Sequence, residues 1–205
     1  MIKYYIQQSW LLIISAFFFG LLLAVTNAAW SGRIEENKIR KLNELMSSLV
    51  ADSEFTVVLS DVEVEIGKGK IVKTDLYKAD GKDGKRSGFC FIASGPGFAD
   101  KIELVIAVDA AFEKIAGYNV LSSNETPGFG DQIVNDYYRR QFIGAPVEKL
   151  TISKGKEQEA KIIDSEIIAI SGATVSSDAV VKIFNNFTEP LKSEVSAAGL
   201  LTGDN

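Results

Sequence analysis

The hydrophobic pattern begins with one long apolar run. Residues 10–30, WLLIISAFFFGLLLAVTNAAW, carry no charge, and roughly twenty helical residues at about 1.5 Å each match the hydrocarbon thickness of a bilayer. Aromatic residues flank this run, as in membrane helices: Tyr4, Tyr5, Trp10 and Trp30. We therefore expect a transmembrane anchor over residues 10–30, after a short segment of residues 1–9. A cleaved signal peptide is the alternative.

The anchor continues into a second helical pattern over residues 31–52. Apolar residues recur there every three or four positions, with charged residues between them: Ile39, Leu42, Leu45, Met46 and Leu49. This spacing predicts an amphipathic helix, which we interpret as a packing element.

From residue 53 the apolar pattern becomes that of short strands. The runs FTVVL, VEVEI, IVKTDLY, GFCFIAS, IELVIAVD and IAGYNVLSS are separated by Gly, Asp and Lys clusters, and LTIS and SEIIAI follow later. Helical spacing is confined to residues 132–144 and to a last helix from about Ser176, which we expect Pro190 to bend or end. The pattern predicts one α+β domain over residues 53–192, with a mostly antiparallel sheet and packed helices, and a flexible tail over 193–205.

Composition removes several kinds of function. The formal net charge of −5 argues against a nucleic-acid partner, whose phosphates need a basic surface. The chain has no histidine, which excludes histidine metal ligands, a bis-histidine haem and a nucleophile–histidine pair. The one cysteine, Cys90, lies between Phe89 and Phe91 and is predicted to be a buried small hydrophobe.

The segment NETPGFGDQI, residues 124–133, is unusually rich in glycine. Pro127 fixes its own backbone angle, while Gly128 and Gly130 allow a positive φ or a close backbone approach. Its simplest interpretation is a turn that leads to a helix capped by Asp131. A loop that approaches a ligand is the alternative.

A second segment, IAISGATVSS at residues 168–177, joins a predicted strand to the last helix. Thr174 and its neighbours then lie where free backbone N–H groups and the positive end of a helix meet, which favours a bound anion and phosphate above all. The plainer interpretation is that Ser176 or Ser177 caps the helix, with Asp178 in its first turn.

The anchor, the α+β domain, ETPGFGD and SGATVSS together resemble the FMN-binding domain family. The likeness is strongest to the G subunits of Rnf complexes, with the C subunits of sodium-translocating NADH:quinone reductases as relatives. It extends from the anchor to about Phe187 and includes the block of residues 97–131. The resemblance implies one anchor followed by one FMN-binding domain.

The resemblance also implies which residues hold the cofactor. A flavin transferase would join the phosphate of FMN to the hydroxyl of Thr174 as a phosphodiester. Gly172 and Ala173 are small enough to leave that hydroxyl accessible, and three serines would donate to phosphate oxygens: Ser171, Ser176 and Ser177. The family's attachment motif usually has an aspartate three residues before its Ser/Thr, where this chain has Ile168.

The glycine-rich loop of the family would pass close to the flavin ring. Its positions fall on Glu125, Thr126, Pro127, Gly128, Phe129 and Gly130. Phe129 stands where the family commonly has leucine, and it would offer the ring an apolar or stacking contact.

The function that the resemblance implies is electron relay between ferredoxin and NAD in an Rnf-type, ion-translocating complex. The partners would be the other membrane subunits, the flavin transferase and the lipid bilayer. We expect no NAD site, because no Rossmann glycine pattern follows a strand. We also expect no independent active site, because electron transfer needs proximity rather than acid–base groups. The family places the domain outside the bacterial cytoplasmic membrane, although the lysines and arginines after the anchor favour the cytoplasm.

Other functions remain open from the sequence. A quinone-reductase subunit or a stand-alone extracytoplasmic electron carrier would share both motifs. A membrane-anchored assembly module, in which the SGAT turn is only a helix cap, is the non-redox alternative.

Overall fold

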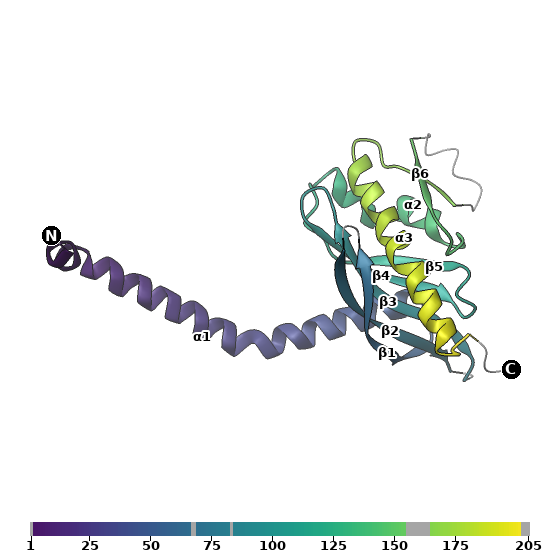
Figure 1. Cartoon of the computed structure of the whole chain (residues 1–205), viewed down its shortest axis with the longest axis horizontal. Coiled ribbons are helices and arrows are strands. Elements are labelled where there is room, and N and C mark those ends of the chain that lie inside the picture. The colour runs from purple at the N-terminus through teal and green to yellow at the C-terminus, as the bar shows by residue number, and fades with distance from the viewer. Residues whose placement is uncertain (1, 67–68, 83, 155–164, 202–205) are drawn as a thin grey trace. The chain divides into compact units, whose positions relative to one another are not determined.

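The computed structural model describes residues 2–66, 69–82, 84–154 and 165–201, and the chain divides into two compact units, residues 1–41 and 42–205 (Figure 1). A single continuous helix, α1 (Ile2–Leu49), runs through the predicted anchor of residues 10–30 and into the predicted helical segment 31–52. Among the described residues it is the one helix long and apolar enough to cross a membrane, and the large apolar side chains between Trp10 and Trp30 are exposed. The helix therefore fits a single-pass anchor.

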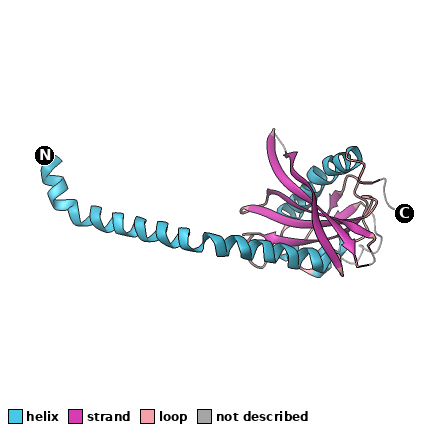
Figure 2. Ribbon diagram, turned by 90° about the horizontal axis from the view of Figure 1, so that it is seen from below, coloured by secondary structure: helices cyan, strands magenta, loops and turns pink. Residues whose placement is uncertain are grey.

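The second unit is built on an antiparallel sheet of five strands in the order β1-β2-β3-β4-β5 (Figure 2). Each strand pairs with the next along the chain, which confirms the predicted antiparallel sheet. FTVVL and VEVEI form one strand, interrupted by register shifts between Val57 and Val62. The strands are β1 (Ser53–Ile66), β2 (Lys70–Gly81), β3 (Arg86–Pro96), β4 (Lys101–Asp109) and β5 (Ile115–Ser122). Two short strands, β6 (Thr151–Ser153) and β7 (Glu166–Ile168), pair in parallel.

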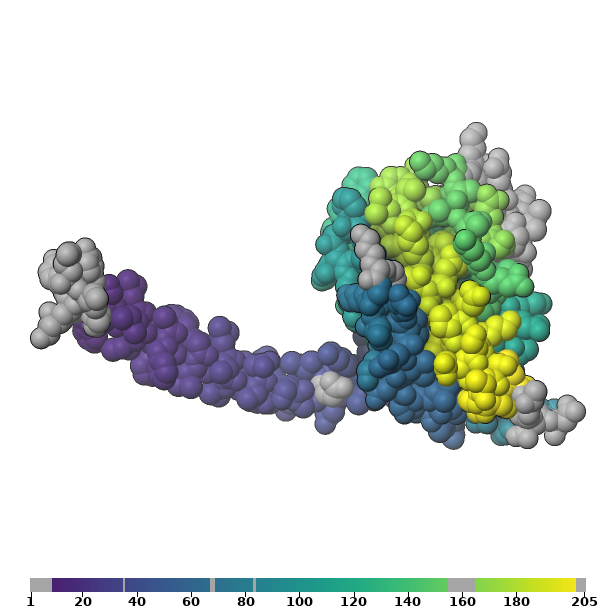
Figure 3. Space-filling model, in the orientation of Figure 1, coloured from purple at the N-terminus to yellow at the C-terminus, as the bar shows by residue number. Residues whose placement is uncertain are grey.

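Helix α3 (Thr174–Ala197) covers one face of this sheet and lies along the β1–β2 hairpin at the surface (Figures 1 and 3). The helix continues through Pro190 and includes residues 193–197, which the sequence pattern places in the tail. Leu191 and Val195, after the proline, are fully buried. Burial of two such side chains, at about 1.5–3 kcal/mol each, offsets the roughly 3 kcal/mol that an internal proline costs. Residues 202–205 lie outside the described residues.

The opposite face of the sheet is covered by the end of α1. Leu42 and Met46 pack there against Cys90, Val105 and Ala107. On the predicted apolar face of the amphipathic helix, Leu42 and Met46 are buried and Leu45 and Leu49 are half-buried, whereas Ile39 is exposed. Cys90 is fully buried, as predicted, and burial raises the pKa of its thiol to about 12.

The helix predicted over residues 132–144 is divided into three short pieces: η1 (Gly130–Val134), α2 (Asp136–Arg139) and η2 (Arg140–Phe142). Asn135 is extended, with φ −75° and ψ 143°, and interrupts the helix after its first turn. The break lets Ile133, Tyr138 and Phe142 all reach the core, where each is fully buried. Core packing therefore overrides the helical spacing of this segment.

Candidate functional site

The turn between β7 and α3 is held by one serine. The Ser177 hydroxyl accepts a hydrogen bond from the Ile170 N–H at 3.0 Å and donates one to the Ala173 carbonyl at 2.9 Å. Gly172 has φ +79°, a conformation that favours glycine. Because Ser177 is fully buried and bonded on both sides, it fixes the turn. It does not reach the cavity, although the sequence indicates a phosphate donor at this position.

Helix α3 begins at Thr174 without a side-chain cap, because Ala173 occupies the N-cap position. Its first intrahelical bond runs from the Ser177 N–H to the Ala173 carbonyl at 3.0 Å. The N–H groups of Thr174, Val175 and Ser176 therefore have no partner inside the helix. The prediction that Ser176 or Ser177 caps the helix is wrong, and the uncapped end retains its attraction for an anion.

Glu125 connects this helix start to two loops. One of its carboxylate oxygens accepts hydrogen bonds from the N–H groups of Phe98, at 2.9 Å, and Ala99, at 3.0 Å. The other accepts the hydroxyl of Ser176. Glu125 is only 5% exposed, so a buried carboxylate joins the β3–β4 turn, its own loop and α3. The sequence pattern gives no sign of these bonds, which span 27, 26 and 51 residues.

Two glycines allow Glu125 to be enclosed this tightly. A Cβ atom on Gly97 would lie 2.3 Å from a Glu125 carboxylate oxygen, and one on Gly130 would lie 2.5 Å from the Ser176 hydroxyl. Gly128 has a different role, since its φ is +78° and a Cβ atom placed on it would meet no described atom within 4 Å. Of the two roles predicted for glycine in this loop, Gly128 thus supplies the positive φ and Gly130 the close backbone approach.

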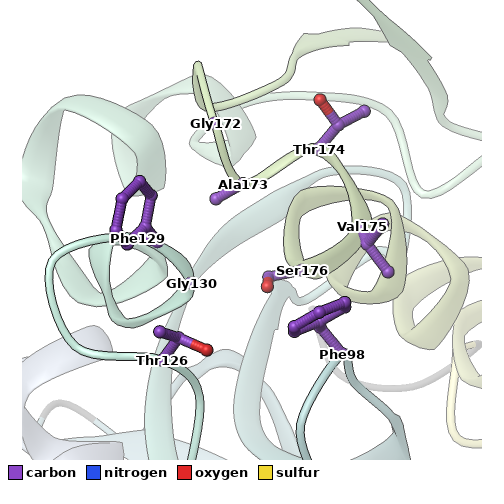
Figure 4. A pocket seen from close by; sticks show the side chains of 9 residues that line it. All are labelled: Phe98, Thr126, Phe129, Gly130, Gly172, Ala173, Thr174, Val175 and Ser176. Atoms are coloured by element: carbon purple, nitrogen blue, oxygen red, sulfur yellow. The ribbon is translucent and has the colours of Figure 1, made fainter.

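The two sequence motifs meet at a cavity of about 380 Å³ (Figure 4). Phe98 and Phe129 lie on different sides of it with Ser176 between them, and these rings are 67% and 56% exposed. The volume falls within the range of about 300–1,000 Å³ that is typical of ligand sites. The cavity is lined by Phe98, Thr126, Phe129, Gly130, Gly172, Ala173, Thr174, Val175 and Ser176.

The sequence-based set of site residues is therefore brought together only in part. Phe98 and Val175 line the cavity but are absent from the predicted set. The sequence signal that could have found Phe98 is its position as an aromatic residue in the glycine-rich segment SGPGF, residues 94–98. Five of the predicted residues do not line it: Ser171, Ser177, Glu125, Pro127 and Gly128. Ser171 is exposed within the β7–α3 turn, and Glu125 contacts the cavity-lining Ser176 without lining the cavity itself.

Two further positions from the sequence analysis lie outside the cavity. Ile168 is buried in β7; its N–H donates to the Gln141 side chain at 2.8 Å, and its carbonyl accepts from the same side chain at 3.2 Å. Asp131 does not cap a helix, because the N-cap position of η1 is Phe129 and has no side-chain bond. One Asp131 carboxylate oxygen is buried without a hydrogen-bond partner among the described residues.

Comparison with known proteins agrees with this geometry. The family described as FMN-binding domain matches residues 97–189. The G subunit of the proton-translocating ferredoxin:NAD(+) oxidoreductase complex of Clostridium ljungdahlii is 30% identical over 172 residues, which are 83% of each chain. The G subunit of the Na(+)-translocating ferredoxin:NAD(+) oxidoreductase complex of Acetobacterium woodii is 31% identical, over 80% of each chain.

A solved structure has the same fold. The crystal structure of NqrC from Shewanella oneidensis has a TM-score of 0.54, with 22% identity over 70% of this chain and 69% of that one. The sequence matches confirm the resemblance that the two motifs indicate. The chain belongs to the FMN-binding domain family, together with the G subunits of ion-translocating oxidoreductase complexes.

Proposed function

We propose that this chain is a membrane-anchored flavoprotein that relays electrons through an FMN attached to the Thr174 hydroxyl by a phosphodiester. It would serve in an Rnf-type, ion-translocating ferredoxin:NAD oxidoreductase complex, the kind of complex to which the named relatives belong. The observation that carries the proposal is the position of Thr174, which lines the cavity and begins an uncapped helix.

The residues at the start of α3 fit a phosphate group. The free N–H groups of the first helical turn and the positive helix end favour a negative charge there. Gly172 and Ala173 present little side-chain bulk beside Thr174. The Ser176 hydroxyl already donates to Glu125, and Ser177 is engaged in the turn. We therefore assign phosphate binding mainly to backbone N–H groups, with exposed Ser171 as the remaining hydroxyl.

The rest of the cavity fits an aromatic ring. Phe98 and Phe129 present largely exposed apolar surfaces to it, which a planar cofactor would cover. Bound FMN would supply the capacity to accept electrons singly or in pairs. The chain would contribute position and shielding, and we assign no catalytic acid or base.

The proposal includes the membrane and the partners. Helix α1 would anchor the chain in the bacterial cytoplasmic membrane, with the second unit on the outer side. The other membrane subunits of the complex would be its redox neighbours. A flavin transferase would be required for maturation.

The test is the mass of the full-length protein after co-expression with a flavin transferase. We expect an FMN-sized increment on the peptide that contains Thr174, and none in Thr174→Ala. Thr126→Ala is the matched control, because Thr126 lines the same cavity from the other loop and should leave the increment unchanged. An increment that persists in Thr174→Ala, or its absence from the unaltered chain, would overturn the covalent assignment.

A further inference from the structure

The five-stranded sheet splits between β2 and β3. These strands pair only where Leu76–Asp80 faces Phe91–Arg86. Beyond that point β2 continues alone with β1 as far as Lys70, and β3 continues alone with β4 as far as Pro96. The β1–β2 hairpin therefore diverges from the rest of the sheet (Figure 2). One side-chain bond joins the two edges at the fork, from the Thr74 hydroxyl to the Ile92 carbonyl at 2.6 Å.

The split leaves backbone groups of β3 without a strand partner. The Ile92 carbonyl points toward β2, since it accepts the Thr74 hydroxyl. Alternate residues of a strand direct their N–H and C=O groups to the same side, so those of Ser94 and the C=O of Pro96 also face the gap. Within the described part of the chain no strand pairs with this side of residues 92–96. Pro96, which lacks an N–H, is typical of an edge.

A groove of about 880 Å³ lies at this split, with α3 along it. Its apolar lining includes Val72 of β2 and Ala179 and Ile183 of α3. Lys70, Lys101 and Lys182 also line it, against one acidic residue, Asp100.

Lys70 is the lysine that an incoming acidic group would meet. Lys101 is paired with Glu103, and Lys182 with Asp178, each at 2.6 Å. Among the described residues Lys70 has no acidic partner. The groove therefore presents unpaired strand edges, an apolar floor and a cation at the end near the hairpin tip.

We propose that this groove binds an extended segment of another protein subunit, which adds as a strand between β2 and β3. An extended polypeptide supplies alternating N–H and C=O groups that a compact small molecule does not, and strand addition to an exposed sheet edge is a common mode of recognition. The segment would be about five residues long, as is the unpaired part of β3, with apolar side chains toward α3 and an acidic side chain near Lys70. That the partner is a subunit of the redox complex rests on the proposed function.

The groove lies next to the cavity that Thr174 lines. Phe98 lines both the groove and the cavity of Thr174. A strand bound in the groove would therefore lie against one wall of the proposed flavin site. Docking would bring the partner beside the flavin without covering Thr174.

Photo-crosslinking in membranes that contain the full chain and the other subunits of the complex tests this proposal. A benzophenone amino acid is placed at exposed Lys182, on the groove, and, as the matched position, at exposed Ser193 on the same helix. We expect an adduct from position 182 to one short segment of another subunit, and none from position 193. An adduct with lipid, with a second copy of this chain or with no partner would overturn the proposal.

Charge variants make the test specific. Lys70→Glu should lower the adduct yield by about tenfold, because like charges at an interface oppose docking. Lys73→Glu is the control, since Lys73 lies on the opposite face of β2 and pairs with Asp61 and Glu63. An equal yield in both variants would contradict the assignment of Lys70.

A third variant separates this proposal from the flavin assignment. In Thr174→Ala the adduct should persist although the FMN increment is lost. If FMN is linked to Thr174 but no adduct forms, only the docking proposal is refuted. If the adduct forms but the unaltered chain carries no FMN, only the flavin assignment is refuted.

Discussion

Glu125 shows how a single carboxylate can hold together the elements around the proposed flavin site without lining the cavity itself. It accepts two backbone N–H groups of the β3–β4 turn and the hydroxyl of Ser176. Hydrogen bonds to an ionised group contribute about 1.5–3 kcal/mol each, and buried donors left without an acceptor cost about 1–3 kcal/mol each. The free energy of unfolding should therefore depend strongly on this side chain.

We expect Glu125→Ala to lower the free energy of unfolding by about 3 kcal/mol, because the buried Ser176 hydroxyl and two backbone N–H groups lose their acceptor. Glu125→Gln keeps an oxygen for the two N–H groups and should cost about 1 kcal/mol. Urea unfolding followed by circular dichroism on residues 40–205 measures both. Glu103→Gln, at a more exposed pair with Lys101, should change the free energy by less than about 0.5 kcal/mol. Equal losses at positions 125 and 103 would contradict the role given to Glu125.

At the scale of single residues the sequence predicts that Thr174 lies at the start of the last helix, but not which residues surround it. The SGAT turn and the following helix are local features, so a strand-to-helix pattern locates them. The bond between Glu125 and Ser176 spans 51 residues, and no local pattern encodes it. Phe98 was missed for the same reason, because its turn reaches the cavity only through the fold. Ser177 lies outside the cavity lining because its hydroxyl is used within the turn.

At the scale of elements, the start of α3 depends on the β7–α3 turn. We expect Ser177→Ala to cost about 1–3 kcal/mol, because it leaves the buried Ile170 N–H without an acceptor and removes one of the two donors to the Ala173 carbonyl. Ser171→Ala in the same turn is exposed and should cost less than about 0.5 kcal/mol. Thermal unfolding of both variants checks the difference. FMN incorporation should also fall in Ser177→Ala, and an unchanged melting temperature in that variant would refute the role of this hydroxyl.

The strands were predictable because each is a short apolar run between turn residues, and the sheet joins neighbours in sequence. The helix boundaries were harder to predict from the sequence. Residues 130–142 break at Asn135 to bury Tyr138 and Phe142, and α3 passes through Pro190 to bury Leu191 and Val195. In both places the free energy of core burial outweighs the local helix signal. The local sequence does not reveal this balance, because the buried contacts come from distant parts of the chain.

At the scale of the whole molecule, α1 belongs to both compact units. Its large apolar residues from Trp10 to Trp30 are exposed and fit the membrane, whereas Leu42 and Met46 complete the core on one face of the sheet. The end of the anchor helix is therefore part of the folded domain. A boundary drawn at residue 53, where the strands begin, would remove part of that core.

Two shortened chains test this division. A chain of residues 40–205 keeps Met46 over Cys90, Val105 and Ala107 and should unfold as one cooperative unit. A chain of residues 51–205 lacks Met46 and Leu42, and we expect it to lose about 2–5 kcal/mol, as for removal of a buried methionine side chain.

The reactivity of the Cys90 thiol distinguishes the two shortened chains. Burial raises the pKa of its thiol to about 12, so at pH 8 the buried thiol is almost entirely protonated and also shielded. In the chain of residues 40–205 it should resist a thiol reagent at pH 8 until urea unfolds the protein. In the chain of residues 51–205 the covering side chains are gone, the thiolate becomes more accessible, and labelling should proceed without urea. Labelling at the same slow rate in both chains would show that the end of α1 is not part of this core.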